Sequence, residues 1–228
     1  MTPWYVCFVG DSFAPRILRE AAERKGLRVT DDPLKAHLVF LSQDTPTASD
    51  GGRDLAFVER MVRANFARGR VNVLTSQVPP GFTRGLGLPL YYQAETLRIK
   101  DALSRALSPE MHIIGCGDPM LELPWPYLEY LRVFDCPILR MTLEEAELAK
   151  IAINYCLARQ VDATNVLVTV AEKYACRWSV IKEVLQHDKR IGPHAYLDAG
   201  DWRMSPHLVR DHATVIAAFS KARSKNGT

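Results

Sequence analysis

Short apolar runs alternate with amphipathic stretches over roughly the first half of the chain. The apolar runs that predict strands are Trp4–Val9, Leu27–Thr30, His37–Ser42, Val71–Thr75, Leu88–Tyr92 and Met111–Gly115. The amphipathic stretches that predict helices between them are Pro15–Lys25, Leu55–Arg68 and Glu95–Ala106. This alternation is typical of a parallel α/β sheet whose strands are joined by right-handed helical crossovers.

The pattern changes after Pro137, where long helical periodicity replaces the short runs. Three helices are expected there, over Leu143–Tyr174, Ser179–Gln186 and Asp211–Lys225. Just before the change, the segment Pro124-Trp125-Pro126-Tyr127 predicts a rigid loop with packing aromatic rings. The expected organisation is a trimmed Rossmann-like α/β domain over residues 1–120, a connecting segment over 121–141 and an all-helical domain over 142–228.

Composition and charge restrict the class of function. The formal charge of the 228 residues is only +3 and the basic residues are dispersed, which argues against a nucleic-acid-binding protein. The apolar run at the N-terminus is too short for a signal peptide or a membrane span, so a cytoplasmic protein that does not enter the membrane is expected.

The cysteines and histidines show no ligand pattern. None of the five cysteines forms a CxxC pair, and the six histidines are scattered, so no metal site is predicted. An odd number of cysteines inside apolar runs predicts reduced, buried thiols.

The turn after the first predicted strand keeps only part of a dinucleotide-binding fingerprint. Gly10 stands at the first glycine position of Gly-x-Gly-x-x-Gly, but Ser12 and Pro15 stand at the second and third. Asp31 and Asp32 follow about 20 residues on, where the ribose-binding carboxylate belongs. The alternative is that Gly10 only allows a strand-to-helix turn and that the two aspartates form a loop or a helix cap.

Several further motifs occur in a fixed order along the chain. They are Asp44-Thr45-Pro46-Thr47, Ser76-Gln77-Val78-Pro79-Pro80-Gly81, Glu95 with Leu97 and Ala102, Leu107-Ser108-Pro109 before His112-Ile113-Ile114-Gly115, Ala146-Glu147-Leu148 with Lys150 and Asn154, Asp188-x-Arg190-Ile191-Gly192, and Asp211. In this order the chain resembles the UDP-glucose/GDP-mannose dehydrogenase family from residue 4 to about residue 215. The match stops where that family continues with a C-terminal nucleotide-sugar-binding domain.

The resemblance implies roles for several side chains. Members of the family oxidise a primary alcohol of a sugar nucleotide twice, with two NAD molecules, through a thiohemiacetal and a thioester on a cysteine. Lys150 and Asn154 are four residues apart on one expected helix, and so share a face on which the family stabilises the oxyanion. Asp211 would support proton transfer, and Glu95 would take part in acid/base chemistry.

His207 stands where the family has its nucleophilic cysteine, four residues before the aspartate. An imidazole does not easily sustain a thioester route, so the oxidation would stop after two electrons. His207 can be a general base, since its ordinary pKa lies near neutrality, or a replacement tolerated after the nucleophile was lost.

The resemblance also implies binding residues. Gly10, Ser12, Asp31, Thr45 and Pro46 would lie against NAD. In a second group, Arg190 and Gly192 would approach the nucleotide sugar or another phosphorylated small molecule, although a simple ion pair after a helix end is an equal reading of Arg190.

In the family that the chain resembles, the long helix that corresponds to Leu143–Tyr174 forms the core of a dimer. In this chain the apolar positions of that helix surround much of its circumference, which predicts a homodimer. They are Ala146, Ile151, Ile153, Cys156, Leu157, Val161, Ala163, Leu167 and Val170.

Two functions stay open at the level of sequence. One is an NAD-dependent oxidoreductase of a sugar nucleotide or a related alcohol. The other is a non-catalytic relative, a dimeric binding or assembly protein that has lost the cofactor. The incomplete glycine motif, the absent cysteine and the few residues between the second and third predicted strands favour the latter.

Overall fold

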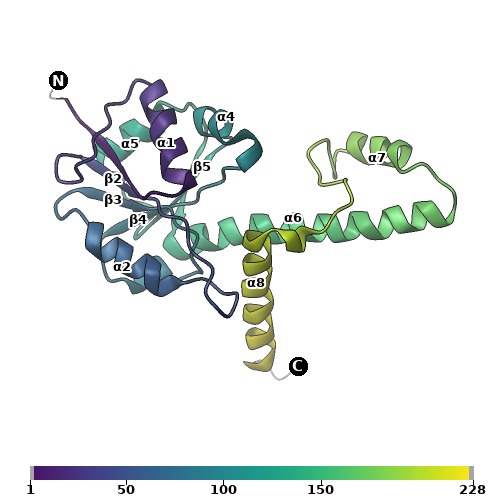
Figure 1. The fold of residues 1–228 in the computed structure, drawn as a ribbon. Coiled ribbons are helices and arrows are strands. Elements are labelled where there is room, and N and C mark those ends of the chain that lie inside the picture. Colours follow the sequence, from purple (N-terminus) through teal and green to yellow (C-terminus); the bar gives the residue numbers. More distant parts are fainter. Residues whose placement is uncertain (1–2, 226–228) are drawn as a thin grey trace. The chain divides into compact units, whose positions relative to one another are not determined.

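The structure, a computed structural model, describes residues 3–225. The chain forms two compact units, residues 1–150 and 151–228, and the boundary lies inside the continuous helix α6 (Leu143–Lys173) (Figure 1). Among the helices of the described residues, none combines the length and apolarity that crossing a membrane requires.

Unit 1 is built on a six-stranded sheet. Its strands are β1 (Val6–Val9), β2 (Leu38–Leu41), β3 (Val71–Leu74), β4 (Leu90–Gln93), β5 (His112–Cys116) and β6 (Ile138–Thr142). They are arranged in the order β1-β2-β3-β4-β5-β6, and every neighbouring pair is parallel except β4 and β5. The predicted α/β class is therefore confirmed, with one antiparallel pair inside the sheet.

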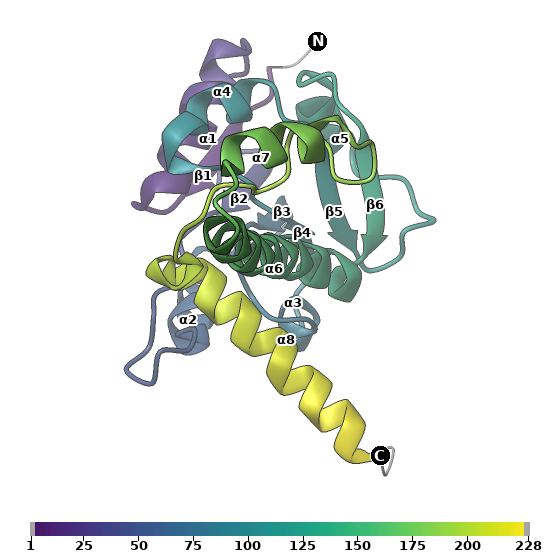
Figure 2. The ribbon, with the colours of Figure 1, turned by 90° about the vertical axis from the view of Figure 1, so that its right-hand side faces the viewer.

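Helices cover both faces of this sheet (Figures 1 and 2). The helices are α1 (Phe13–Arg24), α2 (Leu55–Asn65), α3 (Phe82–Gly85), the 3₁₀ turn η1 (Ile99–Asp101), α4 (Ala102–Leu107) and α5 (Trp125–Arg132). α1, α4 and α5 lie on one face, whereas α2 and α3 lie on the other. This is the layered arrangement expected where strands are apolar on both sides.

Aromatic rings fill the space between the sheet and α5. Phe40 stacks on Phe8 at 5.0 Å between ring centroids and meets Tyr130 at 4.6 Å. Tyr127 is fully buried, and its hydroxyl donates to Gln93 Oε1 at 2.9 Å. Burial of each such apolar side chain stabilises the folded state by about 1.5–3 kcal/mol relative to exposure, so this aromatic layer holds α5 against the sheet.

Gly115 allows the start of α6 to approach the sheet. A Cβ placed on Gly115 would lie 3.0 Å from Leu143 Cα and 3.0 Å from Ala146 Cβ. Real Cβ atoms rarely approach backbone atoms so closely, and a side chain at this position would push the first turn of α6 away from β5.

Unit 2 is helical and has a smaller core. It contains the rest of α6, α7 (Trp178–His187), the 3₁₀ turn η2 (Trp202–Met204) and α8 (Pro206–Lys225). Its buried cluster is Ala158, Val161 and Trp202, and the Trp202 Nε1 donates to Asp162 Oδ1 at 2.7 Å.

Most predicted elements are present, but three predictions about them were wrong. Leu27–Thr30 is not a strand, since only an isolated bridge joins Val29 to Val6. The segment from Pro124 to Tyr127 is not a loop, because α5 begins there with Pro126 in its first turn, where a missing N–H costs nothing. The third helix of the helical half begins at Pro206, ahead of the expected Asp211.

The expectation of buried thiols holds only for part of the chain. Cys7 and Cys116 are buried and Cys136 is half-buried, and burial raises the pKa of Cys7 to about 11. Cys156 and Cys176 are exposed, which contradicts the prediction for these two residues. All five thiols are free, as expected.

Candidate functional site

Side chains tie together the turns at the carboxyl ends of β1 and β2. Gln43 Oε1 accepts from the amide of Asp11 at 3.0 Å, and Ser12 Oγ accepts from the amide of Asp44 at 3.0 Å. The segment after β3 joins them through Ser76 Oγ, which donates to the Gln43 carbonyl at 2.6 Å. In open α/β sheets this edge is where ligands bind.

Gly10 is required by the close approach of Gln43. Its φ is +135°, and a Cβ there would lie 3.0 Å from Gln43 Oε1 and 3.1 Å from both Gln43 N and Pro15 Cγ. A glycine is thus needed at position 10 because Gln43 and Pro15 of the same chain pack against it, whether or not a ligand binds.

The residues of this turn do not fit the pyrophosphate of a dinucleotide as they stand. A Rossmann turn offers free backbone amides to the phosphates, whereas here the Asp11 amide is already bonded to Gln43 and Pro15 has no amide to give. Ser12 uses its hydroxyl on Asp44 instead of leaving the turn open. The turn thus lies where a dinucleotide-binding turn would lie, but its Asp11 amide and Ser12 hydroxyl are already hydrogen-bonded within the protein.

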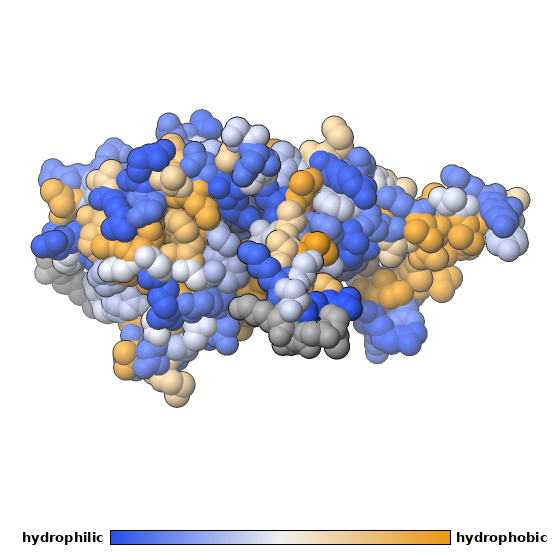
Figure 3. All heavy atoms as spheres, turned by 90° about the horizontal axis from the view of Figure 1, so that it is seen from below, coloured by the Kyte–Doolittle hydropathy of each residue, from blue (hydrophilic) through white to orange (hydrophobic). Residues whose placement is uncertain are grey.

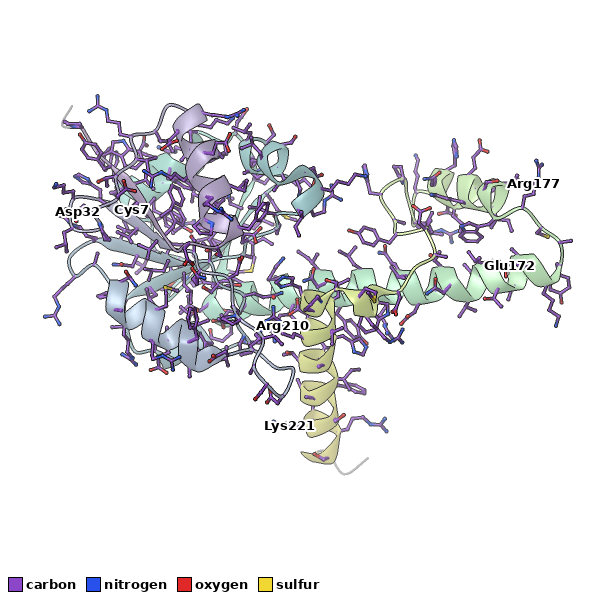
Figure 4. All side chains as sticks on the ribbon, viewed as in Figure 1. Cys7, Asp32, Glu172, Arg177, Arg210 and Lys221 are labelled. Carbon is purple, nitrogen blue, oxygen red and sulfur yellow. The ribbon has the colours of Figure 1, made fainter. Side chains whose placement is uncertain are left out.

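The carboxylates expected at a ribose are engaged elsewhere. Asp31 is exposed and pairs with Arg19 at 2.5 Å, on α1. Asp32, labelled in Figure 4, accepts from the amide of Leu34 at 2.9 Å and so forms a local turn. These contacts agree with the alternative considered from the sequence, in which the two aspartates belong to a loop and do not bind a ribose.

Thr45 and Pro46 hold the loop after β2. Thr45 is buried and its hydroxyl donates to the Gln77 carbonyl at 2.8 Å. The Pro46 carbonyl accepts from the amide of Asp54, the N-cap of α2, at 2.9 Å. Both residues position this loop beside the segment that follows β3.

Glu95 lies within electrostatic range of Lys150 in unit 1. Loss of solvent raises the pKa of Glu95 above its usual value, while the Lys150 ammonium and the Leu97 amide act in the opposite direction. A carboxyl with a raised pKa exchanges its proton closer to neutral pH, which suits a general acid or base.

Glu147 belongs to the motif Ala146-Glu147-Leu148 and has a structural role that the sequence did not reveal. It is completely buried, and its two carboxylate oxygens accept from the amides of Gly81 at 2.5 Å and Thr83 at 2.8 Å. Burial raises its pKa, and these hydrogen bonds act against the rise. Glu147 therefore fixes the turn before α3 to the start of α6. The sequence could have indicated this role, because Glu147 stands at a position of the expected helix that faces the core, where a carboxylate needs hydrogen-bond partners.

Asn154 and Asp211 are brought together in unit 2. Asn154 Nδ2, on α6, donates to Asp211 Oδ2, on α8, at 2.7 Å, although the residues are 57 positions apart in sequence. Asp211 is completely buried. A buried carboxylate needs such a partner, since an unpaired one is costly.

His207 lies one helical turn before Asp211 and is exposed. Its Nδ1 is 2.9 Å from Nη2 of Arg210. Arg210 lies near the start of α8 (Figure 4). A guanidinium only donates, so Nδ1 is the acceptor and the imidazole carries its proton on Nε2. To act as a base, His207 must first release Arg210, and this contact favours a structural replacement of the cysteine.

Arg190 and Gly192 lie in the turn after α7. Arg190 is exposed and makes a bidentate pair with Asp188, at 3.0 and 2.7 Å. Gly192 has a φ of +85°, and its amide donates to the Asp188 carbonyl at 2.8 Å. The simple ion pair considered from the sequence is present, and it leaves Arg190 accessible at the surface.

The chain is similar in sequence to nucleotide-sugar dehydrogenases. It is 27% identical to the UDP-glucose 6-dehydrogenase AglM of Haloferax volcanii over 90% of this chain and 53% of that protein. It is 26% identical to the GDP-mannose 6-dehydrogenase of Pseudomonas aeruginosa over 79% of this chain and 47% of that protein. The chain thus spans about half the length of these curated relatives. No family model matches it.

Solved structures share the fold. The UDP-glucose dehydrogenase of Pyrobaculum islandicum covers 97% of this chain with a TM-score of 0.75 at 23% identity, and the chain covers 65% of that structure. An NDP-N-acetyl-D-galactosaminuronic acid dehydrogenase from Methanosarcina mazei covers 97% of this chain with a TM-score of 0.68 at 18% identity, and the chain covers 62% of that structure. In sequence and in fold, the chain is similar to nucleotide-sugar dehydrogenases, among them UDP-glucose and GDP-mannose 6-dehydrogenases.

Proposed function

We propose that this chain is a nucleotide-sugar dehydrogenase-like protein that oxidises a sugar nucleotide or a related alcohol in a single two-electron step. The observation that carries the proposal is the hydrogen bond between Asn154 and Asp211, two residues that the resemblance assigned to catalysis. The Asp211 carboxylate is completely buried and the Asn154 amide is half-buried, and burying a carboxylate is costly unless it is hydrogen-bonded.

The proton chemistry falls to Glu95 and Lys150 in unit 1. An alcohol that becomes an aldehyde or ketone loses a hydride and a proton. Glu95, with its raised pKa, is suited to accept the proton, and the Lys150 ammonium is suited to hold the alkoxide charge that develops. Position 207 offers no thiol, so the aldehyde is not captured covalently and the oxidation ends there.

NAD is the cofactor class that the family resemblance implies, and when bound it would supply the hydride acceptor. The proposal meets an obstacle at the turn after β1, because the Asp11 amide that would face its phosphates is bonded to Gln43. The same contact favours a second candidate function, a non-catalytic relative that binds sugar nucleotides or assembles with partners without using a cofactor.

The homodimer is also part of this proposal, and unit 2 supplies its surface. Several large apolar side chains of α6 and α7 are exposed, among them Val166, Val170 and Val184. Figure 3 shows hydrophobic surface gathered over the part of unit 2 that contains these two helices. A second copy that packs on this surface would remove it from water.

Thermal unfolding with NAD, NADP, NADH and a panel of UDP- and GDP-sugars tests the proposed function. A ligand that binds only the folded chain raises the midpoint. A shift with a sugar nucleotide supports the binding assignment. A further shift with a dinucleotide supports the oxidoreductase, and its absence selects the non-catalytic candidate.

The variant Lys150→Ala tests the chemistry. We expect it to abolish aldehyde formation, measured as dinucleotide reduction by absorbance, while the dimer stays intact. Lys173→Ala is the matched control, because Lys173 is an exposed lysine on the same helix. An unchanged rate in Lys150→Ala would remove this residue from the mechanism.

A further inference from the structure

Gln43 follows β2 directly, and its side chain reaches the turn that follows β1. Its carboxamide oxygen takes the amide of Asp11 at 3.0 Å. In a Rossmann turn this is the kind of donor that a phosphate oxygen takes. We infer that Gln43 is an intramolecular latch that keeps a diphosphate out of this turn. The inference rests on the proposed function for the class of ligand.

The backbone of Gln43 has its own hydrogen bond, separate from that of its side chain. The Gln43 carbonyl accepts from Ser76 Oγ at 2.6 Å. The side chain is only half-buried, and its bond to Asp11 lies at the surface. The latch can therefore turn away without moving β1 or β2.

A second bond keeps the turn in shape when the latch is removed. Ser12 Oγ still accepts from the Asp44 amide at 3.0 Å, so the two turns stay joined without Gln43. Truncating Gln43 frees one donor and leaves the surrounding loops in place. The carboxylates of Asp11 and Asp44 repel a phosphate and limit the gain.

Binding of ADP-ribose, a diphosphate ligand without nicotinamide, tests the latch by isothermal titration calorimetry. We expect Gln43→Ala to bind up to about tenfold more tightly than the wild-type chain, because the ligand no longer has to break the hydrogen bond between the Gln43 carboxamide and the Asp11 amide. Gln43→Glu keeps an acceptor and adds negative charge, so it should bind no more tightly than wild type.

Gln160→Ala is the matched control. Gln160 Oε1 also accepts a backbone amide, that of Tyr196 at 2.9 Å, but it lies in unit 2. This variant should bind ADP-ribose as the wild type does. Equal affinity of the wild-type, Gln43→Ala and Gln160→Ala chains would overturn the inference.

Amide exchange of Asp11, followed by NMR, tests the latch without a ligand. The Asp11 amide should exchange several-fold faster in Gln43→Ala than in wild type, because its acceptor is gone. An unchanged rate overturns the latch even if the variant binds ADP-ribose. UDP-glucose titrated into the same proteins separates the two ideas: failure of every chain to bind it counts against the proposed function, whereas the ADP-ribose ratio judges the latch.

Discussion

The two units differ in how much of their apolar surface they bury by themselves. In unit 1, Phe8, Phe40, Tyr127 and Tyr130 are all buried between the sheet and α5. In unit 2 the buried cluster has three members, while many large apolar side chains of α6, α7 and α8 remain in water. The sheet unit therefore buries its large apolar side chains in its own core, whereas the helical unit leaves an apolar surface of the kind that the proposed dimer would cover.

Two phenylalanines give the sharpest test of this contrast. Phe40 in β2 is 1% exposed, whereas Phe219 in α8 is 59% exposed. We expect Phe40→Ala to lower the free energy of unfolding by about 3–5 kcal/mol, because it leaves a cavity in the core. Phe219→Ala should change it by no more than about 0.5 kcal/mol at concentrations where the chain is monomeric. Urea unfolding measures both, and similar losses would abolish the distinction.

The pH dependence of stability tests whether His112 is shielded from water in the core of unit 1. Burial lowers the pKa of His112 to about 4 from its ordinary value of 6.5. The unfolded chain therefore binds a proton that the folded chain refuses, so stability is lost as pH falls from about 6.5 to about 4. One pKa unit corresponds to about 1.4 kcal/mol, which gives a loss of about 3 kcal/mol over that window.

Denaturant unfolding at several pH values measures the effect of His112. The variant His112→Gln should flatten the acid side of the stability curve, although it is less stable at neutral pH. His187→Gln, at an exposed position of α7, should keep the wild-type slope. A wild-type slope in His112→Gln would show that other groups cause the acid loss.

The smallest effect on folding is expected at two exposed aliphatic residues. Val184 in α7 is 65% exposed, and Leu34 in unit 1 is 66% exposed. If the proposed dimer buries Val184, Val184→Asp should shift the chain from dimer to monomer in sedimentation velocity, because the introduced charge would be buried without a partner. Leu34→Asp should leave the association unchanged. Neither should alter protomer stability by more than about 0.5 kcal/mol.

The sequence predicted the strands that are apolar on both sides and missed the one that is not. β1, β2 and β3 appear as apolar runs because helices cover both faces of the sheet. β6 has the sequence Ile-Leu-Arg-Met-Thr and is partly exposed, so it gives no such run. α5 was hidden by two prolines, which a helix tolerates in its first turn.

The candidate site was predictable only in part. Asn154 and Asp211 were each assigned to the site through the family resemblance, but their contact was not predicted, since no periodicity relates residues so distant in sequence. The contact of Gln43 with the Asp11 amide was not predictable, because it depends on where two loops from separate strands end. Residue types indicated which groups are present, and the fold determined which of them are already engaged.

Gly115 has a consequence for how this gene can change. Every missense change at its codon adds a Cβ that would lie 3.0 Å from Leu143 Cα, a backbone atom that cannot step aside alone. At Gly117, two codons later, an added Cβ would meet nothing within 4 Å. Substitutions are therefore expected to be tolerated at Gly117 and selected against at Gly115 for as long as α6 starts against β5, so two glycine codons separated by a single codon are expected to vary to very different extents.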